Sequence, residues 1–424
     1  MVPDNAMSDG AQGQQPNPDV TPMNAIPLAG YHPDMDAMRR DVEALASMSR
    51  SSARSGERES ASWLRRRLAD VGVPDVQLEA YRYQPSYALA HGVHNVVGIG
   101  ACRLGGLTGG LLAAATLWSY EREVSGSSQW VRRLLPGGEG ANVVARVRAR
   151  SERSAAVVLV AHHDAANTGV VWNPRLVAAG GARHMRRRQV DPFMAPLEVA
   201  LLLAAAGSLL GRRSSLGRRA RAVAAGILAV ACAVAADVGR GETVPGACDN
   251  ASGVAACLDL ARAVCAEPLE HTEVVFVFPG SEEAGMGGMA AFLDRHGAGL
   301  GVDTFVLGLD TLGSGTPIVC TGEGAMREQR YAERDVALVE QGAAIIGEPA
   351  PQRCRIGAWT DPVLAVHRGL RAASVLSMGP GYFPHYHHPS DLPEAVDWES
   401  VAACARIAAG TIAAFAGQAG VQPG

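Results

Sequence analysis

Short apolar runs and segments with helical spacing alternate along most of the chain. Apolar residues recur every three or four positions from Asp36 to Val71, which predicts helices, and a strand is expected at Val76–Tyr83. Further runs have the length and the flanking residues of buried strands: Asn142–Val147, Val157–Ala161, Val274–Phe278 and Phe305–Leu309. Helical patterns accompany them at Ser252–Cys265, Met289–His296, Ala332–Ile346 and Trp398–Phe415. We therefore expect an α/β fold, with a mixed, mostly parallel central sheet and helices on both faces.

Two stretches rich in Ala, Gly and Leu interrupt this alternation, at about residues 88–120 and 194–236. Each divides into two apolar runs of about 15–18 residues, somewhat shorter than the roughly 20 that cross a bilayer comfortably. The first pair is joined near Arg103, and the second by a turn expected to carry Arg212, Arg213, Arg218, Arg219 and Arg221. Two interpretations stay open: hairpins packed on the domain or on a partner subunit, or a four-helix membrane anchor. Arginines at residues 183–188 flank the other end, so the positive-inside rule does not orient the hairpins.

The expected organisation is one domain over residues 36–416, interrupted by the two hairpins and preceded by a disordered tail over residues 1–35. The tail is rich in Pro, Asp, Asn, Gln and Met, which is typical of disorder. It lacks a basic segment followed by an apolar one, so no signal peptide is expected. Two cellular locations stay open: the protein is associated with a membrane through the hairpins, or it is cytoplasmic. The oligomeric state is left open.

Charge and composition exclude several classes of function. The 38 basic and 42 acidic residues nearly cancel, so nucleic acid is not expected as a partner. None of the basic residues is a lysine, which excludes P-loop, protein kinase and Schiff-base chemistry. Eight scattered cysteines with no C-x-x-C pair fit neither a disulfide framework nor a zinc finger. Carboxylate, imidazole, thiol, hydroxyl or a metal remain for catalysis.

Acidic and imidazole side chains follow the predicted strands. His162, His163 and Asp164 come after the second of the buried runs, Glu282 and Glu283 after the third, and Asp310 after the fourth. Two loops add Asp249, within G-A-C-D-N-A-S-G, and the segment Tyr386–Asp391. Each has an ordinary explanation taken singly, such as a helix cap for Asp249. Together they predict a site for zinc or a similar divalent ion where the carboxyl ends of the strands meet.

Five motifs in one order carry a family resemblance: H-x-D, G-A-C-D-N-A-S-G, G-S-E-E-A-G, L-D and Y-H-H-P-S-D. In this order they resemble the zinc aminopeptidases of metallopeptidase family twenty-eight, of the bacterial di-zinc leucyl aminopeptidase type. The resemblance covers roughly residues 36–85, 140–170 and 245–416, outside the tail and the hairpins. It implies a zinc-exopeptidase fold for the domain and a peptide substrate.

The resemblance also implies roles for individual residues. Two zinc ions, or other divalent metals, would be bridged by Asp249. His162 and Asp310 would complete one ion's protein ligands, and Glu283 and His387 the other's. Glu282 would be the general base, and Asp164 would orient His162.

Some positions depart from the family pattern or leave alternatives. Cys248 stands where the family usually has an acidic residue beside the bridging aspartate. His163 and His388 are alternative imidazoles next to the proposed ligands, and His387 is preferred for its H-x-P-x-D spacing to Asp391. Alternative functions are a glutaminyl-cyclase-like acyltransferase, whose site resembles a single-zinc version, and a noncatalytic receptor-like module. The complete ligand set favours a metal-dependent exopeptidase, most simply an aminopeptidase.

Overall fold

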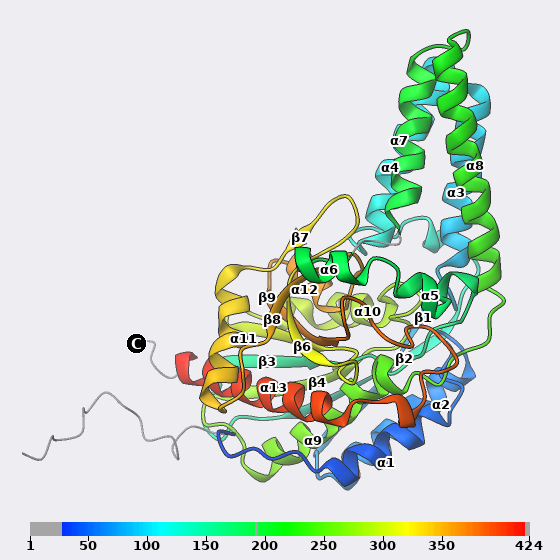
Figure 1. Cartoon of the computed structure of the whole chain (residues 1–424). Coiled ribbons are helices and arrows are strands. Elements are labelled where there is room, and N and C mark those ends of the chain that lie inside the picture. The colour runs from blue at the N-terminus through cyan, green and yellow to red at the C-terminus, as the bar shows by residue number, and fades with distance from the viewer. Residues whose placement is uncertain (1–27, 191–193, 420–424) are drawn as a thin grey trace, which may run out of the picture.

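The computed structural model describes residues 28–190 and 194–419 (Figure 1). Most of the expected tail, residues 1–27, lies outside this part of the chain. A mixed sheet forms the centre, with strand order β1-β2-β4-β3-β5-β9-β6-β7 and β8 beside β6. Its strands are β1 (Asp75–Tyr83), β2 (Gly138–Val147), β3 (Ala155–Val160), β4 (Thr272–Phe278), β5 (Thr304–Leu309), β6 (Thr316–Glu323), β7 (Gln329–Arg330), β8 (Gln352–Ile356) and β9 (Arg371–Met378).

The middle of the sheet is parallel and entirely buried. Strands β4, β3, β5 and β9 lie side by side in parallel, and every residue of β3, β4 and β5 is buried. Burial on both faces explains why these strands are continuous apolar runs in the sequence. At one edge β2 runs antiparallel to β4, and β1 to β2; at the other, β6 runs antiparallel to β9. The predicted mixed α/β fold is confirmed.

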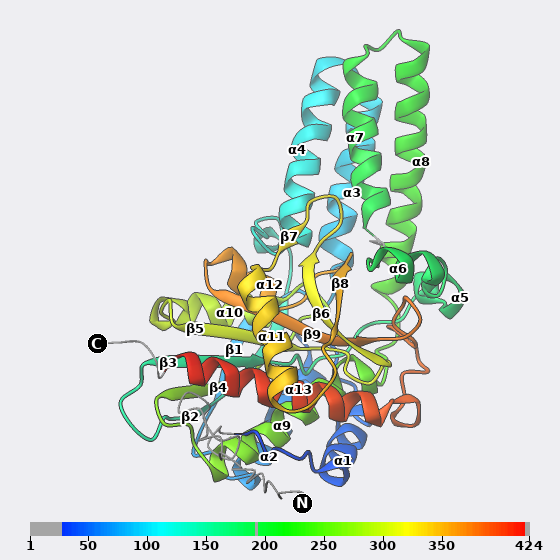
Figure 2. The ribbon, with the colours of Figure 1, turned by 60° about the vertical axis from the view of Figure 1, so that its left-hand side comes forward.

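Helices cover both faces of this sheet (Figure 2). One face is covered by α1 (Met35–Ala46), α2 (Ser55–Asp70), α9 (Ser252–Ala266) and α13 (Trp398–Ala419), with α11 (Glu333–Ile345) packed on α13. The other is covered by α10 (Gly287–His296) and α12 (Pro362–His367). The carboxyl ends of β3, β4, β5 and β9 therefore open at one edge between the two helical layers, where such folds bind their ligands.

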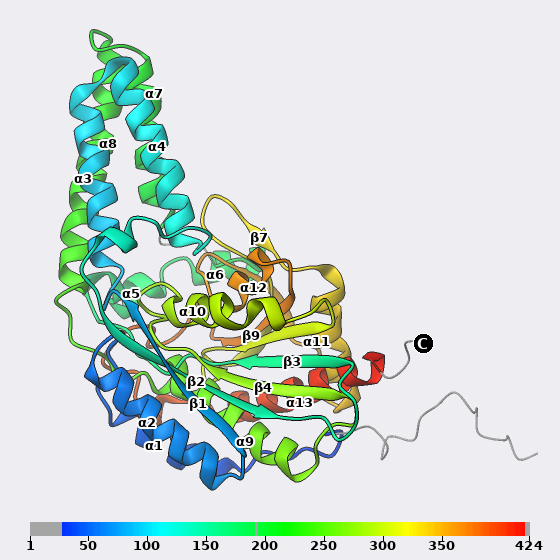
Figure 3. The same ribbon diagram turned by 180° about the vertical axis from the view of Figure 1, so that it is seen from behind.

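The two apolar stretches form four helices that project from the domain as a bundle (Figures 1 and 3). They are α3 (Ala88–Leu104), α4 (Gly106–Val124), α7 (Ala195–Leu209) and α8 (Ser215–Val238). The hairpins pack on each other, α3 against α8 and α4 against α7, rather than lying flat on the domain. The short helices α5 (Pro174–Val177) and α6 (Gly181–Arg187) lie near the root of the bundle.

The sequence-based prediction of the turn between α7 and α8 was wrong in one respect. Arg218, Arg219 and Arg221 lie within α8 and not in the turn. The helix begins early because the Ser214 side chain accepts a hydrogen bond from Gly217 N at 3.1 Å, which caps its first turn. Only Arg212 and Arg213 of the predicted group remain between the helices.

Candidate metal centre

The first site residues follow directly from the end of β3. His162 and Asp164 are both buried. His162 Nδ1 lies 3.3 Å from the carbonyl oxygen of Asp164 and 3.5 Å from its Oδ1, which leaves Nε2 directed at the other acidic residues. Asp164 also accepts hydrogen bonds from Ser52 Oγ at 2.7 Å and from the backbone N–H of Glu282 and Glu283 at 3.0 and 3.2 Å. It therefore connects the end of β3 to the glutamate loop.

Asp249 lies in a turn (η4, Ala247–Ala251) that leads into α9. Its backbone N–H donates to Asp391 Oδ2 at 3.1 Å, and that of Cys248 donates to Asp391 Oδ1 at 2.8 Å. The next side chain, Asn250, accepts from Thr311 N at 3.1 Å and donates to Leu309 O at 2.9 Å. These contacts fasten the turn to the end of β5 and to the loop that carries His387.

The two glutamates follow β4 in a loop held by a buried carboxylate. Glu57 accepts from Ser281 Oγ at 2.8 Å and from Ala141 N at 2.8 Å. Burial raises the pKa of Glu57 to about 7. Ser281 itself has a φ of 52°, a left-handed conformation that is uncommon for a residue other than glycine. Such backbone persists only where its surroundings enforce it, and Glu57 and Asp164 provide two of those constraints.

His387 comes from the loop after β9 and is held between aromatic rings. Its ring stacks on Tyr386, with centroids 3.8 Å apart, and meets Trp172 edge-on at 4.4 Å. Its φ of 51° is again left-handed. Packing on both sides fixes the direction of Nε2, which points toward Asp249 and Glu283.

The predicted ligand residues come together in two groups that share Asp249. Asp249 Oδ1 lies 3.2 Å from His162 Nε2, which is itself 3.7 Å from Asp310 Oδ1. Asp249 Oδ2 lies 3.4 Å from His387 Nε2, which is 2.9 Å from Glu283 Oε2. Within each group the ligand atoms all lie within 4.8 Å of one another. Glu282 lies beside them, its Oε2 4.0 Å from His162 Nε2.

The chemistry of these groups fits divalent cations. Two imidazoles and three carboxylates are the ligand types that zinc prefers, in sets of three per group. Glu283 Oε1 is buried and accepts no hydrogen bond from any residue in the described part of the chain. A buried carboxylate oxygen without a donor costs free energy, and a bound cation supplies the missing partner.

The electrostatics agree with a cation site. Burial raises the pKa of Glu282 well above its ordinary value; His162 opposes this shift, and the charges of Asp361, Glu283 and Asp310 add to it. Burial likewise raises the pKa of Glu283 to about 7. Such shifts mark an excess of buried negative charge. A cation reverses them, because it favours the ionised carboxylates.

The alternative imidazoles point elsewhere. His163 Nε2 lies 2.9 Å from Ala141 O and its Nδ1 2.7 Å from Ser60 Oγ, so both ring nitrogens are engaged behind the sheet edge. His388 Nδ1 lies 2.8 Å from Ser390 Oγ. Cys248 directs its Sγ at Ser314 Oγ, 3.1 Å away, and burial raises the pKa of its thiol well above the ordinary value. None of the three belongs to the ligand groups found among the described residues.

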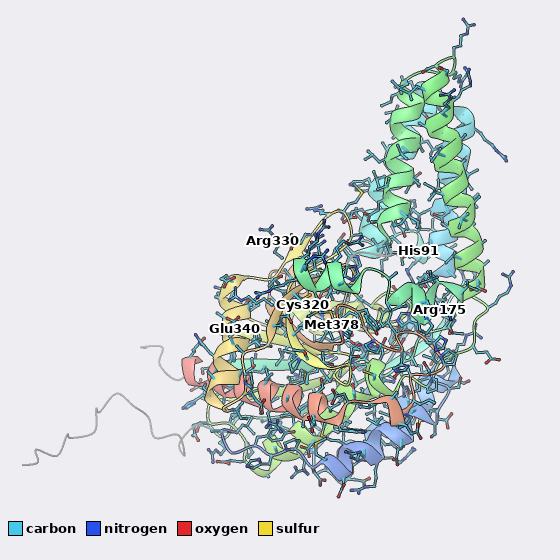
Figure 4. All side chains as sticks on the ribbon, viewed as in Figure 1. His91, Arg175, Cys320, Arg330, Glu340 and Met378 are labelled. Atoms are coloured by element: carbon cyan, nitrogen blue, oxygen red, sulfur yellow. The ribbon has the colours of Figure 1, made fainter. Side chains whose placement is uncertain are left out.

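A cleft opens beside the glutamates at the root of the bundle. It is lined on the side of the candidate metal ligands by Glu282, Glu283 and His387, and on the bundle side by Glu123 and the start of α3, where Figure 4 labels His91. Further walls come from residues that the sequence analysis did not single out: Tyr87, Arg132, Trp172 and Trp359. Their only signal in the sequence is aromatic or basic character beside an insertion, which does not distinguish a cleft from an ordinary surface.

Comparison with known proteins finds a family match in part of the chain. Residues 233–412 match the model of peptidase family M28. A comparison with curated proteins finds no match.

Solved structures share the fold at low sequence identity. An aminopeptidase from Aneurinibacillus sp. strain AM-1 is 15% identical, with a TM-score of 0.53, and the match covers 91% of this chain and 94% of that one. A Zn-dependent exopeptidase from Parabacteroides distasonis is 12% identical, with a TM-score of 0.50 and coverages of 92% and 98%. A glutaminyl cyclase from Fimbriiglobus ruber is 14% identical, with a TM-score of 0.53 and coverages of 91% and 96%.

At these identities the solved structures establish the fold, and the family match concerns residues 233–412. The motifs that resembled metallopeptidase family twenty-eight lie on this fold at its expected ligand edge. Residues 233–412 of the chain therefore carry the sequence signature of peptidase family M28, on a fold shared with an aminopeptidase and a Zn-dependent exopeptidase of known structure.

Proposed function

We propose that the chain is an aminopeptidase that holds two zinc ions and uses Glu282 as its general base. One observation carries the proposal: the two oxygens of Asp249 face different histidines, Oδ1 toward His162 and Oδ2 toward His387. A carboxylate directed at two imidazoles in this way is arranged to bridge two ions. His162 and Asp310 would hold one ion, and Glu283 and His387 the other.

The chain's own residues then divide the work of hydrolysis. Bound zinc supplies Lewis acidity and lowers the pKa of water at the site. Glu282 is not needed to complete either group that contains Asp249, so its carboxylate is free to accept a proton. It accepts that proton at Oε2 from the water that attacks the scissile carbonyl carbon. It then donates the proton to the leaving amine nitrogen.

Asp164 acts as a positioning residue. Asp164 accepts hydrogen bonds from the backbone N–H of Glu282, the proposed base, and of Glu283, a proposed metal ligand. It thereby holds both glutamates at a fixed distance from His162. The contact with His162 Nδ1 also favours the tautomer that leaves Nε2 free for a metal.

The cleft suits the amino end of a peptide. Glu282 and Glu283 put negative charge beside the reacting position, which attracts an α-ammonium group. Apolar and aromatic walls, among them Val124, Trp172 and Trp359, surround the space that the first side chain would occupy. An aminopeptidase with a preference for apolar N-terminal residues follows from this combination.

The test uses the full chain with zinc and a panel of aminoacyl-p-nitroanilides. We expect turnover of apolar aminoacyl substrates, and none of the N-acetylated substrates, which lack the ammonium group. Glu282→Gln should keep its metal content and lose about 10²–10⁴-fold in kcat, the range for a general base. Glu270→Gln, at an exposed glutamate, is the matched control and should leave kcat unchanged.

Two outcomes contradict the proposal. Unchanged turnover in Glu282→Gln removes that residue from the mechanism. Absence of aminoacyl hydrolysis, with cyclisation of N-terminal glutaminyl peptides instead, assigns the chain to the glutaminyl-cyclase branch, whose fold it shares. A noncatalytic module is the weaker alternative, because every predicted ligand position is filled.

A further inference from the structure

The outer surface of the four-helix bundle is apolar. More than half of the exposed large hydrophobic side chains in the described part of the chain lie on α3, α4, α7 and α8. Six of them, from all four helices, are between 47% and 69% exposed: Val96, Leu107, Leu111, Leu202, Val223 and Val230. A water-soluble bundle places such side chains in its core and polar ones outside.

The interior of the distal half of the bundle is made of small residues: Ala101, Cys102, Ala113, Ala204, Ala205 and Ala224. Nearer the catalytic domain the core also contains the large side chains of Tyr120, Leu201 and Leu228. The helices approach so closely that a Cβ added at Gly109 would lie 2.5 Å from Ala101 O, and one at Gly217 would lie 2.6 Å from Gly207 O. Small residues that let backbones touch are typical of helices packed within a membrane. The distal half of the bundle is thus inverted relative to a soluble one, with small side chains inside and large apolar ones outside.

The charges of the bundle are confined to its two ends. No Asp, Glu or Arg occurs between Arg221 and Asp237 on α8, or between Gly106 and Glu121 on α4. At the distal end, guanidinium groups bind carbonyls that the helix ends leave free: Arg212 Nε donates to Leu104 O at 2.8 Å, and Arg221 Nη1 to Gly207 O at 2.8 Å. Backbone groups satisfied in this way are needed wherever water is excluded.

The root of the bundle has the features of a membrane–water boundary. Trp118 is 61% exposed near the lower end of α4, where an aromatic side chain suits the headgroup level. Glu198, close to the start of α7, is fully buried and accepts a hydrogen bond from Met326 N of the catalytic domain at 2.9 Å. The carboxylate therefore faces protein rather than the outer surface.

The length of the longest helix matches a bilayer. At about 1.5 Å per residue the 24 residues of α8 span about 36 Å, against a hydrocarbon core of about 30 Å. The charge-free part is shorter, and the distal arginines make up the difference because their long side chains reach toward the headgroups. Helix α13 is also long and apolar, but 83% of its apolar window is buried in the domain, against 33% for α8. Length and composition alone do not separate the two helices, whereas their surroundings do.

We propose that the bundle of α3, α4, α7 and α8 is embedded in a phospholipid bilayer, with its arginine-rich end in the headgroup region of the distal leaflet. The arginines at residues 212, 213, 218 and 219 meet anionic phosphates there, and the apolar sides of the helices contact acyl chains. The bundle has two complete hairpins, so the chain returns to the same side each time and the catalytic domain folds as one unit.

The first test is the behaviour of the full-length chain in cells and in vesicles. We expect it in the membrane fraction, resistant to alkaline carbonate, released by detergent, and floating with vesicles of phosphatidylcholine and phosphatidylglycerol. Recovery in the soluble fraction without detergent overturns the proposal. A soluble dimer also overturns it, because a second copy would then cover the apolar surface. Release by carbonate refutes the embedded arrangement in favour of surface binding.

The second test works with single substitutions that preserve the fold. Leu111→Cys places a thiol on the outer face of the bundle, and Val302→Cys places one on the exposed surface of the catalytic domain, where Val302 is 86% exposed. The other cysteines in the described part of the chain are buried or half-buried, and the wild-type chain measures their background. In vesicles, a membrane-impermeant maleimide should label Val302→Cys at least tenfold faster than Leu111→Cys. Equal labelling at both positions contradicts the proposal, and neither test depends on peptidase activity.

Discussion

Glu323 is a buried carboxylate whose protonation couples the stability of the cleft wall to pH. It lies at the end of β6 with no exposed surface. It accepts hydrogen bonds from Thr360 N at 2.7 Å, Thr360 Oγ1 at 2.6 Å and Tyr331 Oη at 2.7 Å. Burial raises its pKa to about 7, although these hydrogen bonds oppose the shift. Through Thr360 it holds the segment 357–361, which includes the cleft residue Trp359.

The shift sets the size and sign of the effect. The folded chain binds the Glu323 proton more tightly than the unfolded chain, whose carboxyl has a pKa of about 4.3. The stabilisation is therefore complete at low pH and is lost as pH rises through about 7. At 1.36 kcal/mol per pKa unit, the folded state loses about 2.5 kcal/mol between pH 5 and pH 8 from this group.

Glu323→Gln removes the titration while keeping the shape. The amide oxygen accepts from Thr360 N, and the NH₂ group donates to the two hydroxyl oxygens, which can rotate to receive it. Urea unfolding of the full chain, followed by tryptophan fluorescence in one detergent at pH 5 to 8, gives the free energy of unfolding of each variant. We expect the variant to gain about 2.5 kcal/mol over wild type as pH rises across this range.

The control is Glu152→Gln, an equal charge change at an exposed position. A difference between Glu323→Gln and wild type that stays constant within about 0.5 kcal/mol from pH 5 to 8 refutes the reasoning. It would mean that Glu323 is ionised in the folded chain throughout, with its charge compensated by a partner.

Three further predictions concern the site and its supports. His387→Asn should lower the zinc content, measured by elemental analysis, by about one ion per chain. The control His388→Asn should keep its zinc, because the His388 ring contacts Ser390. Equal losses of zinc would show that His387 is not the ligand of the two histidines. Zinc at about 100 times its Kd should raise the free energy of unfolding by about 2.7 kcal/mol, and a chelator should abolish this gain. If calorimetry finds the same unfolding temperature with and without zinc, the folded chain does not bind zinc in preference to the unfolded chain. Gly288→Ala should lower the free energy of unfolding, measured with urea, by about 1–3 kcal/mol, because the added Cβ would lie 2.4 Å from Gly280 O. The control Gly299→Ala should leave it unchanged, because there is open space around Gly299. Equal effects of the two substitutions would show that close packing at Gly288 does not cause the loss of stability.

Three strands of the parallel centre, β3, β4 and β5, were predictable because they are buried on both faces and form continuous apolar runs. The edge strands β1 and β2 were also expected within a few residues of their bounds. Strands β6, β7, β8 and β9 were not predicted. The sequence of β9, R-A-A-S-V-L-S-M, has Ala and Ser where strands usually have branched side chains. It becomes a strand because β5 and β6 pair with it on either side, which is a tertiary effect.

The sequence by itself determined which residue types the site contains and their order along the chain. His162, Glu282 and Asp310 closely follow strands and Asp249 precedes a helix, so their place at the ligand edge follows from local chain geometry, whereas His387 lies in a longer loop after β9. Distances across that edge depend on strand order. Only the folded chain brings Asp249 between His162 and His387, and turns His163 and His388 away.

The tertiary structure also decided which side of each apolar hairpin is exposed. Their sequence is equally compatible with a buried core and with a lipid-facing surface, because composition does not record which side of a helix faces outward. The structure packs Ala101, Ala204 and Ala224 inward and leaves Leu107, Leu111 and Val230 outside. That direction is set by the packing of α3 against α8 and of α4 against α7, which are far apart in the sequence, so no local pattern encodes it.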